Sequence, residues 1–153
     1  MKINDIQNEI IKEMSELDDW MDKYEYLINL GRSFNPPVKK IRNDDNALMG
    51  CQSKVWISAE LKDQRVFFFA DSDSLIIRGL LALLMRVLNN QHPKDIVSSN
   101  LYFIEQTGLS TNLSPSRANG LASIVKHLKL CAAKFATTDR GSVSHHRNKN
   151  KLC

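Results

Sequence analysis

Cys51 is the residue whose type and setting are best suited to chemistry. It follows Gly50 and precedes the polar residues Gln52 and Ser53 in the segment GCQSKVW, so its thiol lies where the chain bends before an apolar run. The thiolate is the reactive form of cysteine, and the exposed amides of this turn, together with Lys54, are expected to favour it. Cys51 is therefore a candidate functional thiol, with a small buried hydrophobic residue as the alternative.

The remaining thiols and imidazoles do not form a recognisable catalytic or metal-binding pattern. Cys131 and Cys153 belong to no CxxC pair, and no histidine lies at zinc-ligand spacing from two cysteines. A thiol hydrolase needs a histidine base, yet no motif ties His92 or His127 to Cys51. The odd number of cysteines argues against a disulfide framework. We therefore expect Cys131, beside two alanines in the last apolar segment, to be a packing residue.

Arg117 lies in an unusual position for its charge. Ser114 and Pro115 predict the start of the last helix, with Ser114 as the N-cap and Pro115 at the first helical position. An arginine in the first turn is unfavourable for the helix dipole, which prefers anions there. We therefore expect Arg117 to support the Cys51 site, and the alternative is an exposed surface charge of little energetic weight.

Hydrophobic periodicity divides the chain into helices and one β-hairpin. It predicts long helices over residues 4–17, 20–33, 75–89 and 115–135, and a short helix over 101–106, with a loop or short helix over 92–97. Runs rich in β-formers predict strands over 55–61 and 66–70. Prolines 36 and 37 end helical structure, so residues 34–47 are expected to be an irregular connection. This order predicts an α+β fold with helices packed against a small antiparallel β-sheet.

Polar and aromatic residues near the predicted helix starts have structural interpretations. Asp18 or Asp19 can cap the second helix, and the segment 71–74 offers capping side chains for the helix that begins at residue 75. For Asp71 and Asp73 we favour capping over a catalytic role. Trp20 and Tyr24 are spaced along one face of the second helix and are expected to belong to the core.

Composition and charge restrict the class of protein. The 153 residues carry a net charge of +4, of which residues 135–153 contribute +3, so the body of the chain is nearly neutral. No basic stripe with interleaved aromatics indicates nucleic-acid binding, and no apolar run reaches the length of a membrane span. The acidic, amphipathic N-terminus does not resemble a signal peptide. We expect a cytoplasmic protein with one domain over residues 1–135 and a disordered basic tail over 136–153.

Four segments resemble sequence blocks of the SufE family, the sulfur acceptors for cysteine desulfurases, and they occur in the family's order. The segment MGCQSKVWI at residues 49–57 resembles the family's active-cysteine signature. The other three are FADSDSLIIRGLLALL at 69–84, HPKDIV at 92–97 and LSPSRANGL at 113–121. The resemblance extends over nearly the whole predicted domain and leaves the tail outside it.

This resemblance implies a SufE/IscU-like fold and a function in sulfur transfer. Proteins like SufE take persulfide sulfur from a cysteine desulfurase, stimulate that enzyme, and deliver the sulfur for iron–sulfur cluster assembly. Cys51 matches the acceptor thiol, while Gly50, Gln52 and Arg117 fall in the matching blocks as supporting residues. The expected partners are a SufS-like desulfurase, which holds pyridoxal phosphate, and a downstream iron–sulfur scaffold complex. The acceptor itself is expected to need neither cofactor nor metal.

Two other functions stay open at this point. An iron–sulfur cluster scaffold of the IscU type has a related fold, but it should offer several cluster ligands, and Cys51 is the one cysteine in the loop region. A thiol hydrolase lacks its base motif. The chain is therefore interpreted as a sulfur carrier and desulfurase activator, with no independent enzyme activity expected.

Overall fold

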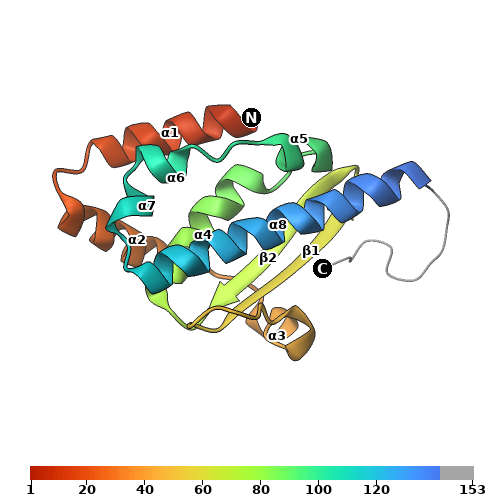
Figure 1. Ribbon diagram of the computed structural model, residues 1–153, viewed down its shortest axis with the longest axis horizontal. Coiled ribbons are helices and arrows are strands. Elements are labelled where there is room, and N and C mark those ends of the chain that lie inside the picture. Colours follow the sequence, from red (N-terminus) through yellow and green to blue (C-terminus); the bar gives the residue numbers. More distant parts are fainter. Residues whose placement is uncertain (142–153) are drawn as a thin grey trace.

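A two-stranded antiparallel hairpin with helices packed against it makes up the fold (Figure 1). The computed structural model describes residues 1–141. In chain order the elements are α1 (Ile3–Ser15), α2 (Trp20–Ser33), α3 (Val38–Ile41), the 3-10 helix η1 (Asp44–Asn46), β1 (Val55–Lys62), β2 (Arg65–Ser72), α4 (Leu75–Leu88), α5 (Pro93–Ser98), α6 (Phe103–Gln106), α7 (Leu109–Asn112) and α8 (Pro115–Gly141). The architecture confirms the predicted α+β class with a small antiparallel sheet.

The hairpin is tight because its turn has only two residues. Val55 pairs with Ser72 at the open end of the sheet, and at the closed end Asp63 and Gln64 have φ values of 53° and 67°. Positive φ at both central positions is what a type I′ turn requires. Buried residues alternate along the first six residues of β2, so one face of the strand packs on the helices. These buried residues are Val66, Phe68 and Ala70.

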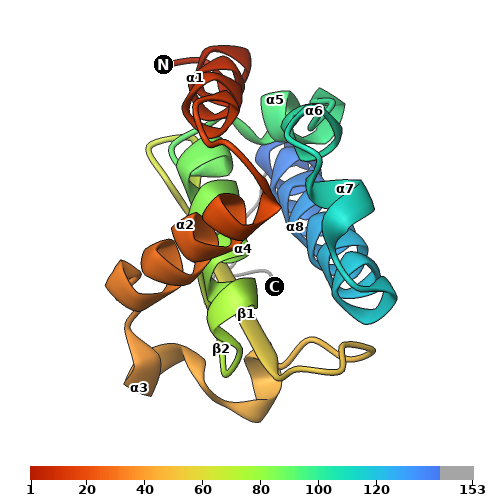
Figure 2. The ribbon, with the colours of Figure 1, turned by 90° about the vertical axis from the view of Figure 1, so that its left-hand side faces the viewer.

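Helix α4 is the central helix of the core, and Figure 2 shows it between α2 and α8. Most of its residues are apolar and buried, since the sequence LIIRGLLALLMRVL leaves almost no polar face. It approaches α2 closely because each helix has a glycine where the two meet. A Cβ on Gly79 would lie 2.2 Å from the carbonyl oxygen of Leu27, and a Cβ on Gly31 would lie 2.3 Å from a backbone oxygen of α4. The two glycines therefore let the helix backbones come into contact.

Helix α8 begins at Pro115, as predicted, and extends further than the sequence indicated. The predicted end was Phe135, but the helix continues to Gly141, so residues 136–141 of the predicted disordered tail are helical. No proline or glycine interrupts this stretch before Gly141, and each added residue contributes another helical hydrogen bond. The rest of the predicted tail, residues 142–153, lies outside the described residues.

Smaller differences from the predicted elements concern the connections. The stretch expected to be irregular contains α3 and η1, and α7 was not predicted. Trp20 and Tyr24 are only partly buried: their rings meet edge to face, with centroids 5.3 Å apart, and pack against the core from its edge. Asp19 caps α2 as expected, because its side chain accepts a hydrogen bond from the Asp22 amide at 3.0 Å.

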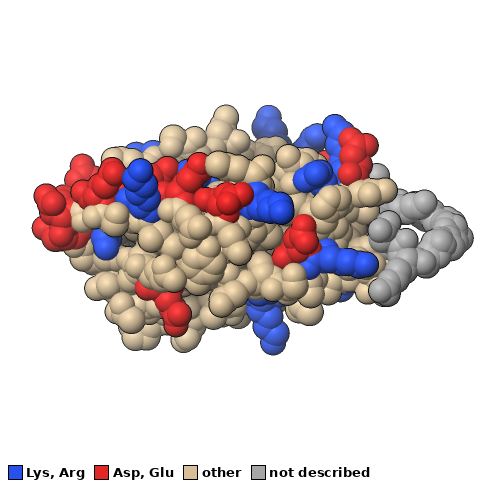
Figure 3. Space-filling view, turned by 90° about the horizontal axis from the view of Figure 1, so that it is seen from above, with Lys and Arg blue, Asp and Glu red and all other residues tan. Residues whose placement is uncertain are grey.

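Acidic side chains gather at the end of the molecule where α1 leads into α2 (Figure 3). Glu16, Asp18 and Asp19 are exposed in this region. Over the rest of this face, basic and acidic side chains are interspersed. Within residues 1–141, no helix is both long and apolar enough to cross a membrane.

Candidate functional site

Cys51 lies on a loop, residues 48–54, that is closed at its base by the sheet. Leu48 donates its amide hydrogen to the carbonyl oxygen of Val55 at 2.8 Å. Gly50 has a φ of 92°, in the left-handed region that favours glycine, so the chain reverses direction immediately before Cys51. Met49, at the tip, is 83% exposed. The Cys51 loop thus has a fixed base and a protruding tip.

The C-terminal end of the Cys51 loop is held by the turn that connects β2 to α4. The Lys54 amide donates to Asp73 Oδ1 at 3.1 Å, and the Lys54 carbonyl accepts from Ser72 Oγ at 2.7 Å. The cap of α4 is Ser74, whose Oγ accepts from the Ile77 amide at 3.3 Å. The predicted capping role of Asp73 is therefore wrong, because this carboxylate binds the Cys51 loop instead.

Asp71 also has a different role from the predicted cap. It is fully buried at the end of β2, where its carboxylate accepts hydrogen bonds from Arg42 Nε at 2.7 Å and from Arg78 Nη1 at 2.6 Å. Arg78 in addition donates to the carbonyl oxygens of Gly31 and Phe34 at the end of α2. A buried carboxylate is stable when it is paired in this way, and the network joins α2, α4 and β2 beneath the Cys51 loop.

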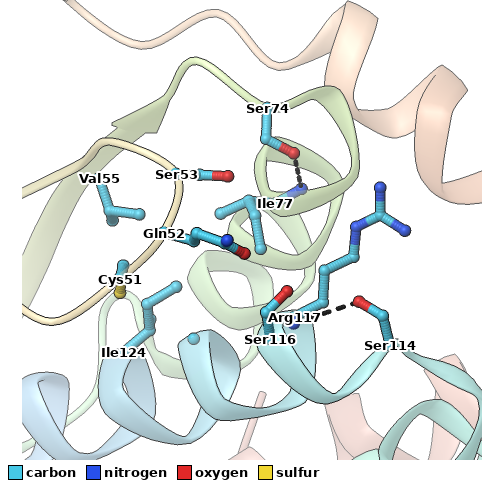
Figure 4. Close-up of a pocket in the computed structure, with 11 residues that line it drawn as sticks. Cys51, Gln52, Ser53, Val55, Ser74, Ile77, Ser114, Ser116, Arg117 and Ile124 are labelled. Carbon is cyan, nitrogen blue, oxygen red and sulfur yellow. Dashed lines mark hydrogen bonds between the residues drawn. The ribbon is translucent and has the colours of Figure 1, made fainter.

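A pocket of about 360 Å³ lies between the Cys51 loop, the start of α4 and the first turns of α8 (Figure 4). Part of its wall is polar and part is apolar. The polar lining residues are Gln52, Ser53, Ser74, Ser114, Ser116 and Arg117. The others are Cys51, Val55, Ile77, Gly120 and Ile124. Segments far apart in the sequence therefore converge on the predicted thiol.

The Cys51 thiol is partly buried and packs against the edge of the core. Burial raises the pKa of this thiol above its ordinary value, because the thiolate loses hydration. The expected stabilisation of the thiolate by Lys54 and neighbouring amides is therefore wrong in direction for this structure. At neutral pH, Cys51 rests as a neutral thiol, with a smaller thiolate fraction than a free cysteine has.

The other predicted site residues lie around the same loop and pocket, but they do not all contact Cys51. Gln52 lines the pocket, whereas Gly50 shapes the turn and is not part of the lining. Arg117 is partly buried in the first turn of α8, and Figure 4 shows it at the opposite side of the pocket from Cys51. Among the described residues, the Arg117 guanidinium has no hydrogen-bond or ion-pair partner, while its amide donates to Ser114 Oγ at 3.4 Å.

Sequence reasoning did not identify Gly120 as part of the site. It lies on the side of α8 that lines the pocket, and a Cβ built on it would lie 4.0 Å from the Cys51 sulfur. A glycine inside a predicted helix was the available signal, because helices disfavour glycine unless something else requires it.

The groups that could have served other chemistry do not converge on this pocket. Cys131 is buried on α8 and does not line the pocket. Burial lowers the pKa of His127, with a smaller contribution from Lys134, and His127 does not line the pocket. Within the described part of the chain, no group of three or more His, Cys, Asp and Glu side chains could hold a metal ion. The scaffold alternative therefore gains no ligand set from this region.

Comparison with known proteins shows sequence similarity over most of the chain. The sequence profile of the SufE family, an Fe-S metabolism associated domain, matches residues 8–132. An uncharacterised SufE-like protein from Synechocystis sp. is 37% identical over 126 residues, covering 82% of this chain and 79% of the relative. An uncharacterised SufE-like protein from Rhizobium etli is 35% identical over 127 residues, covering 80% of this chain and 86% of the relative.

A solved structure shares the fold. The solution structure of a hypothetical protein from Thermus thermophilus matches with a TM-score of 0.71 and 16% sequence identity, over 87% of this chain and 97% of that one. Because the family profile matches most of its length and two SufE-like relatives are 37% and 35% identical to it, this chain belongs to the SufE family, whose domain is associated with iron–sulfur metabolism.

Proposed function

We propose that this protein accepts sulfur on Cys51 from the persulfide of a cysteine desulfurase, stimulates that enzyme, and delivers the sulfur for iron–sulfur cluster assembly. The observation that carries the proposal is the placement of a free thiol in a pocket, on a loop with a protruding tip, in a chain of the SufE family. A carrier needs one thiol that a partner can reach and a place that shelters the product.

The transfer step is a thiol–disulfide type exchange. The Cys51 thiolate attacks the outer sulfur of the donor persulfide, R–S–SH. A new S–S bond forms to Cys51, the S–S bond in the donor breaks, and the donor cysteine leaves as its thiolate R–S⁻. The product is Cys51–S–SH, and no external oxidant or reductant is consumed.

The surroundings of Cys51 suit a carrier of persulfide better than a redox dithiol. Among the described residues, no second cysteine lines the pocket. A neighbouring thiol would attack the inner sulfur of the persulfide, form a disulfide with Cys51 and release the outer sulfur as hydrogen sulfide. The loop tip is exposed at Met49, which gives a desulfurase a segment to bind. The proposed donor is a SufS-like enzyme that supplies pyridoxal phosphate chemistry, so this chain needs no cofactor of its own, and the proposed location is the cytoplasm.

Three neighbours are proposed to support the acceptor. Gly50 gives the loop its reversal, and Gln52 forms part of the pocket wall beside Cys51. Arg117 lies across the pocket, and its guanidinium has no hydrogen-bond or ion-pair partner among the described residues. Its positive charge would therefore stabilise an anionic sulfur on Cys51 electrostatically, without direct contact. In this proposal, the polar lining of the pocket and the Arg117 guanidinium surround the anionic Cys51 persulfide.

The test is to incubate the protein with a cysteine desulfurase and cysteine and to locate the added sulfur. We expect one adduct of about 32 Da on the peptide that contains Cys51, lost on treatment with a reductant. The peptides that contain Cys131 and Cys153 serve as internal controls and should stay unmodified. Cys51→Ser should keep the fold, because a hydroxyl fits the same space, and should take up no sulfur. A Cys51→Ser protein that stimulates the desulfurase as well as the wild type does would overturn the assignment.

A further inference from the structure

Gly120 lies inside helix α8, where the helix itself gives no reason for glycine. Position 120 is buried and follows the first turn of the helix, and alanine is the better helix former at such a position. A Cβ built on Gly120 would lie 4.0 Å from the Cys51 sulfur. Among the described residues, apart from the two chain neighbours of Gly120 and the nearby backbone of α8, no other heavy atom comes within 4 Å of that point. The absent side chain therefore leaves an open space directly beside the thiol.

The glycines in α2 and α4 show what a packing requirement looks like in the same molecule. A Cβ on Gly31 or Gly79 would lie 2.3 Å or 2.2 Å from a backbone oxygen, so each is needed for the helices to meet. A methyl group at position 120 would make only an ordinary contact with Cys51. The protein with a free thiol thus has room for alanine at this position, so its packing gives no steric reason for glycine.

We propose that Gly120 keeps open the place that the outer sulfur of a Cys51 persulfide occupies. This inference rests on the proposed function and adds a residue that determines which adduct the pocket accepts. An S–S bond is about 2.05 Å long, so an outer sulfur directed at this space would approach an alanine methyl to about 2 Å. Non-bonded heavy atoms prefer about 3.5–4.0 Å, so the two groups exclude one another.

The walls beside this space suit an added sulfur atom. Ile124 lies one helical turn beyond Gly120, and Ile77 of α4 lines the same pocket. A sulfur atom is polarisable and makes favourable contacts with apolar neighbours. The persulfide formed when the Cys51 thiolate takes the outer sulfur from R–S–SH, with release of R–S⁻, would then rest against α8 between transfers. Alanine at position 120 would block this resting position while leaving the free thiol undisturbed.

The experiment compares Gly120→Ala with Asn119→Ala and with the wild type. Asn119 is the preceding residue of α8, is exposed and does not line the pocket, so its replacement changes helix propensity without filling the site. Without added sulfur, Gly120→Ala should unfold at a temperature equal to that of the wild type or about 2 °C higher. After incubation with a desulfurase and cysteine, its yield of Cys51 persulfide should fall at least about fivefold, the lower end of what overpacking produces. Asn119→Ala should give the wild-type yield.

A second measurement separates failure of this inference from failure of the proposed function. Methyl methanethiosulfonate converts the Cys51 thiolate to Cys51–S–S–CH₃ with release of methanesulfinate, so it places a second sulfur on Cys51 without any desulfurase. This adduct should lower the unfolding temperature of Gly120→Ala and leave that of the wild type unchanged. If the wild type takes no sulfur from a desulfurase, the proposed function fails. If the wild type does so and Gly120→Ala gives the same yield and the same stability of its adduct, or unfolds before modification, the role of Gly120 is wrong.

Discussion

Replacing Asp71 with asparagine tests the ion-pair network beneath the Cys51 loop. The substitution keeps the shape of the side chain but removes the negative charge, and the new amide nitrogen meets a guanidinium donor at one of the two positions. Breaking a buried ion pair by removing one partner costs about 3–5 kcal/mol. The side chains of Arg42 and Arg78 keep 34% and 18% of their exposure, so water stabilises them in part. We therefore expect the free energy of unfolding to fall by about 3 kcal/mol, at the lower end of that range.

Urea denaturation measures this loss. With a slope of about 2 kcal/mol per molar urea, the midpoint of Asp71→Asn should fall by about 1.5 M. Glu13→Gln is the matched control, because Glu13 receives two hydrogen bonds of 2.8 Å from Arg86, but the two side chains are 43% and 37% exposed. The same change from carboxylate to amide should cost less than about 1 kcal/mol there.

The comparison of the two variants tests whether burial is the reason for the large contribution of the Asp71 ion pairs to the free energy of unfolding. Equal midpoint shifts for Asp71→Asn and Glu13→Gln would refute the reasoning, because each carboxylate accepts two hydrogen bonds from arginine but only that of Asp71 is buried. A second consequence concerns the site. Ser72 follows Asp71 and holds the Lys54 carbonyl, so loosening the end of β2 should free the Cys51 loop. Alkylation of Cys51 by iodoacetamide under native conditions should then be faster in Asp71→Asn than in Glu13→Gln.

Three further predictions concern the thiol, the helix contact and the pocket. Because burial raises the pKa of Cys51, the pH midpoint of its alkylation should lie above the value of about 8.5 for a free thiol, and a midpoint at or below that value would contradict the pocket geometry. The same shift makes the free energy of unfolding depend on pH. The contribution of the Cys51 thiol to that free energy is complete below the pKa of the unfolded chain's thiol and is lost as the pH rises through the pKa of the folded protein's thiol. Gly79→Ala should destabilise the protein by about 3 kcal/mol in urea denaturation, since its methyl would meet the Leu27 carbonyl, and an unchanged midpoint would show that the helices can separate at little cost. Arg117→Ala should leave the urea midpoint unchanged and lower the yield of Cys51 persulfide, with partial recovery in Arg117→Lys; an unchanged yield would leave Arg117 as surface charge.

The parts of the fold that the sequence predicted are those that depend on local patterns. The two strands, the long helices and the start of α8 at Pro115 follow from periodicity and capping residues within a few positions of one another. The end of α8 is the exception among the long helices. Its last residues lack an apolar face, which favoured a disordered tail, but a helix that is already formed can continue through residues that bury nothing.

The roles of Asp71 and Cys51 needed contacts that no local pattern contains. An aspartate that lies between a predicted strand and a predicted helix has the same sequence surroundings whether it caps the helix or pairs with arginines. Its two partners lie 29 and 7 residues away, so only the folded chain distinguishes the two roles. The polar neighbours of Cys51 did not determine whether its thiol is exposed or sheltered at rest. Part of its surroundings comes from α8, more than sixty residues later in the chain, where Gly120 and Ile124 line the same pocket.

In the proposed function, a sulfur acceptor faces two opposing demands, and different parts of the Cys51 loop would meet them. At rest, a thiol with a raised pKa has little thiolate, and since the thiolate is the form that oxidants and electrophiles attack, the buried position protects it. For transfer, the same thiol must lose its proton and reach the donor persulfide. The base of the loop is fixed at Leu48 and Lys54, whereas among the described residues no atom lies within 4 Å of a Cβ built on Gly50 at the tip. Movement of the tip alone, with the base held, would bring Cys51 into a more hydrated environment, where its pKa falls towards the ordinary value and its thiolate becomes available. In the proposed function, docking of the desulfurase supplies that environment, so the protein stays unreactive until its donor is present.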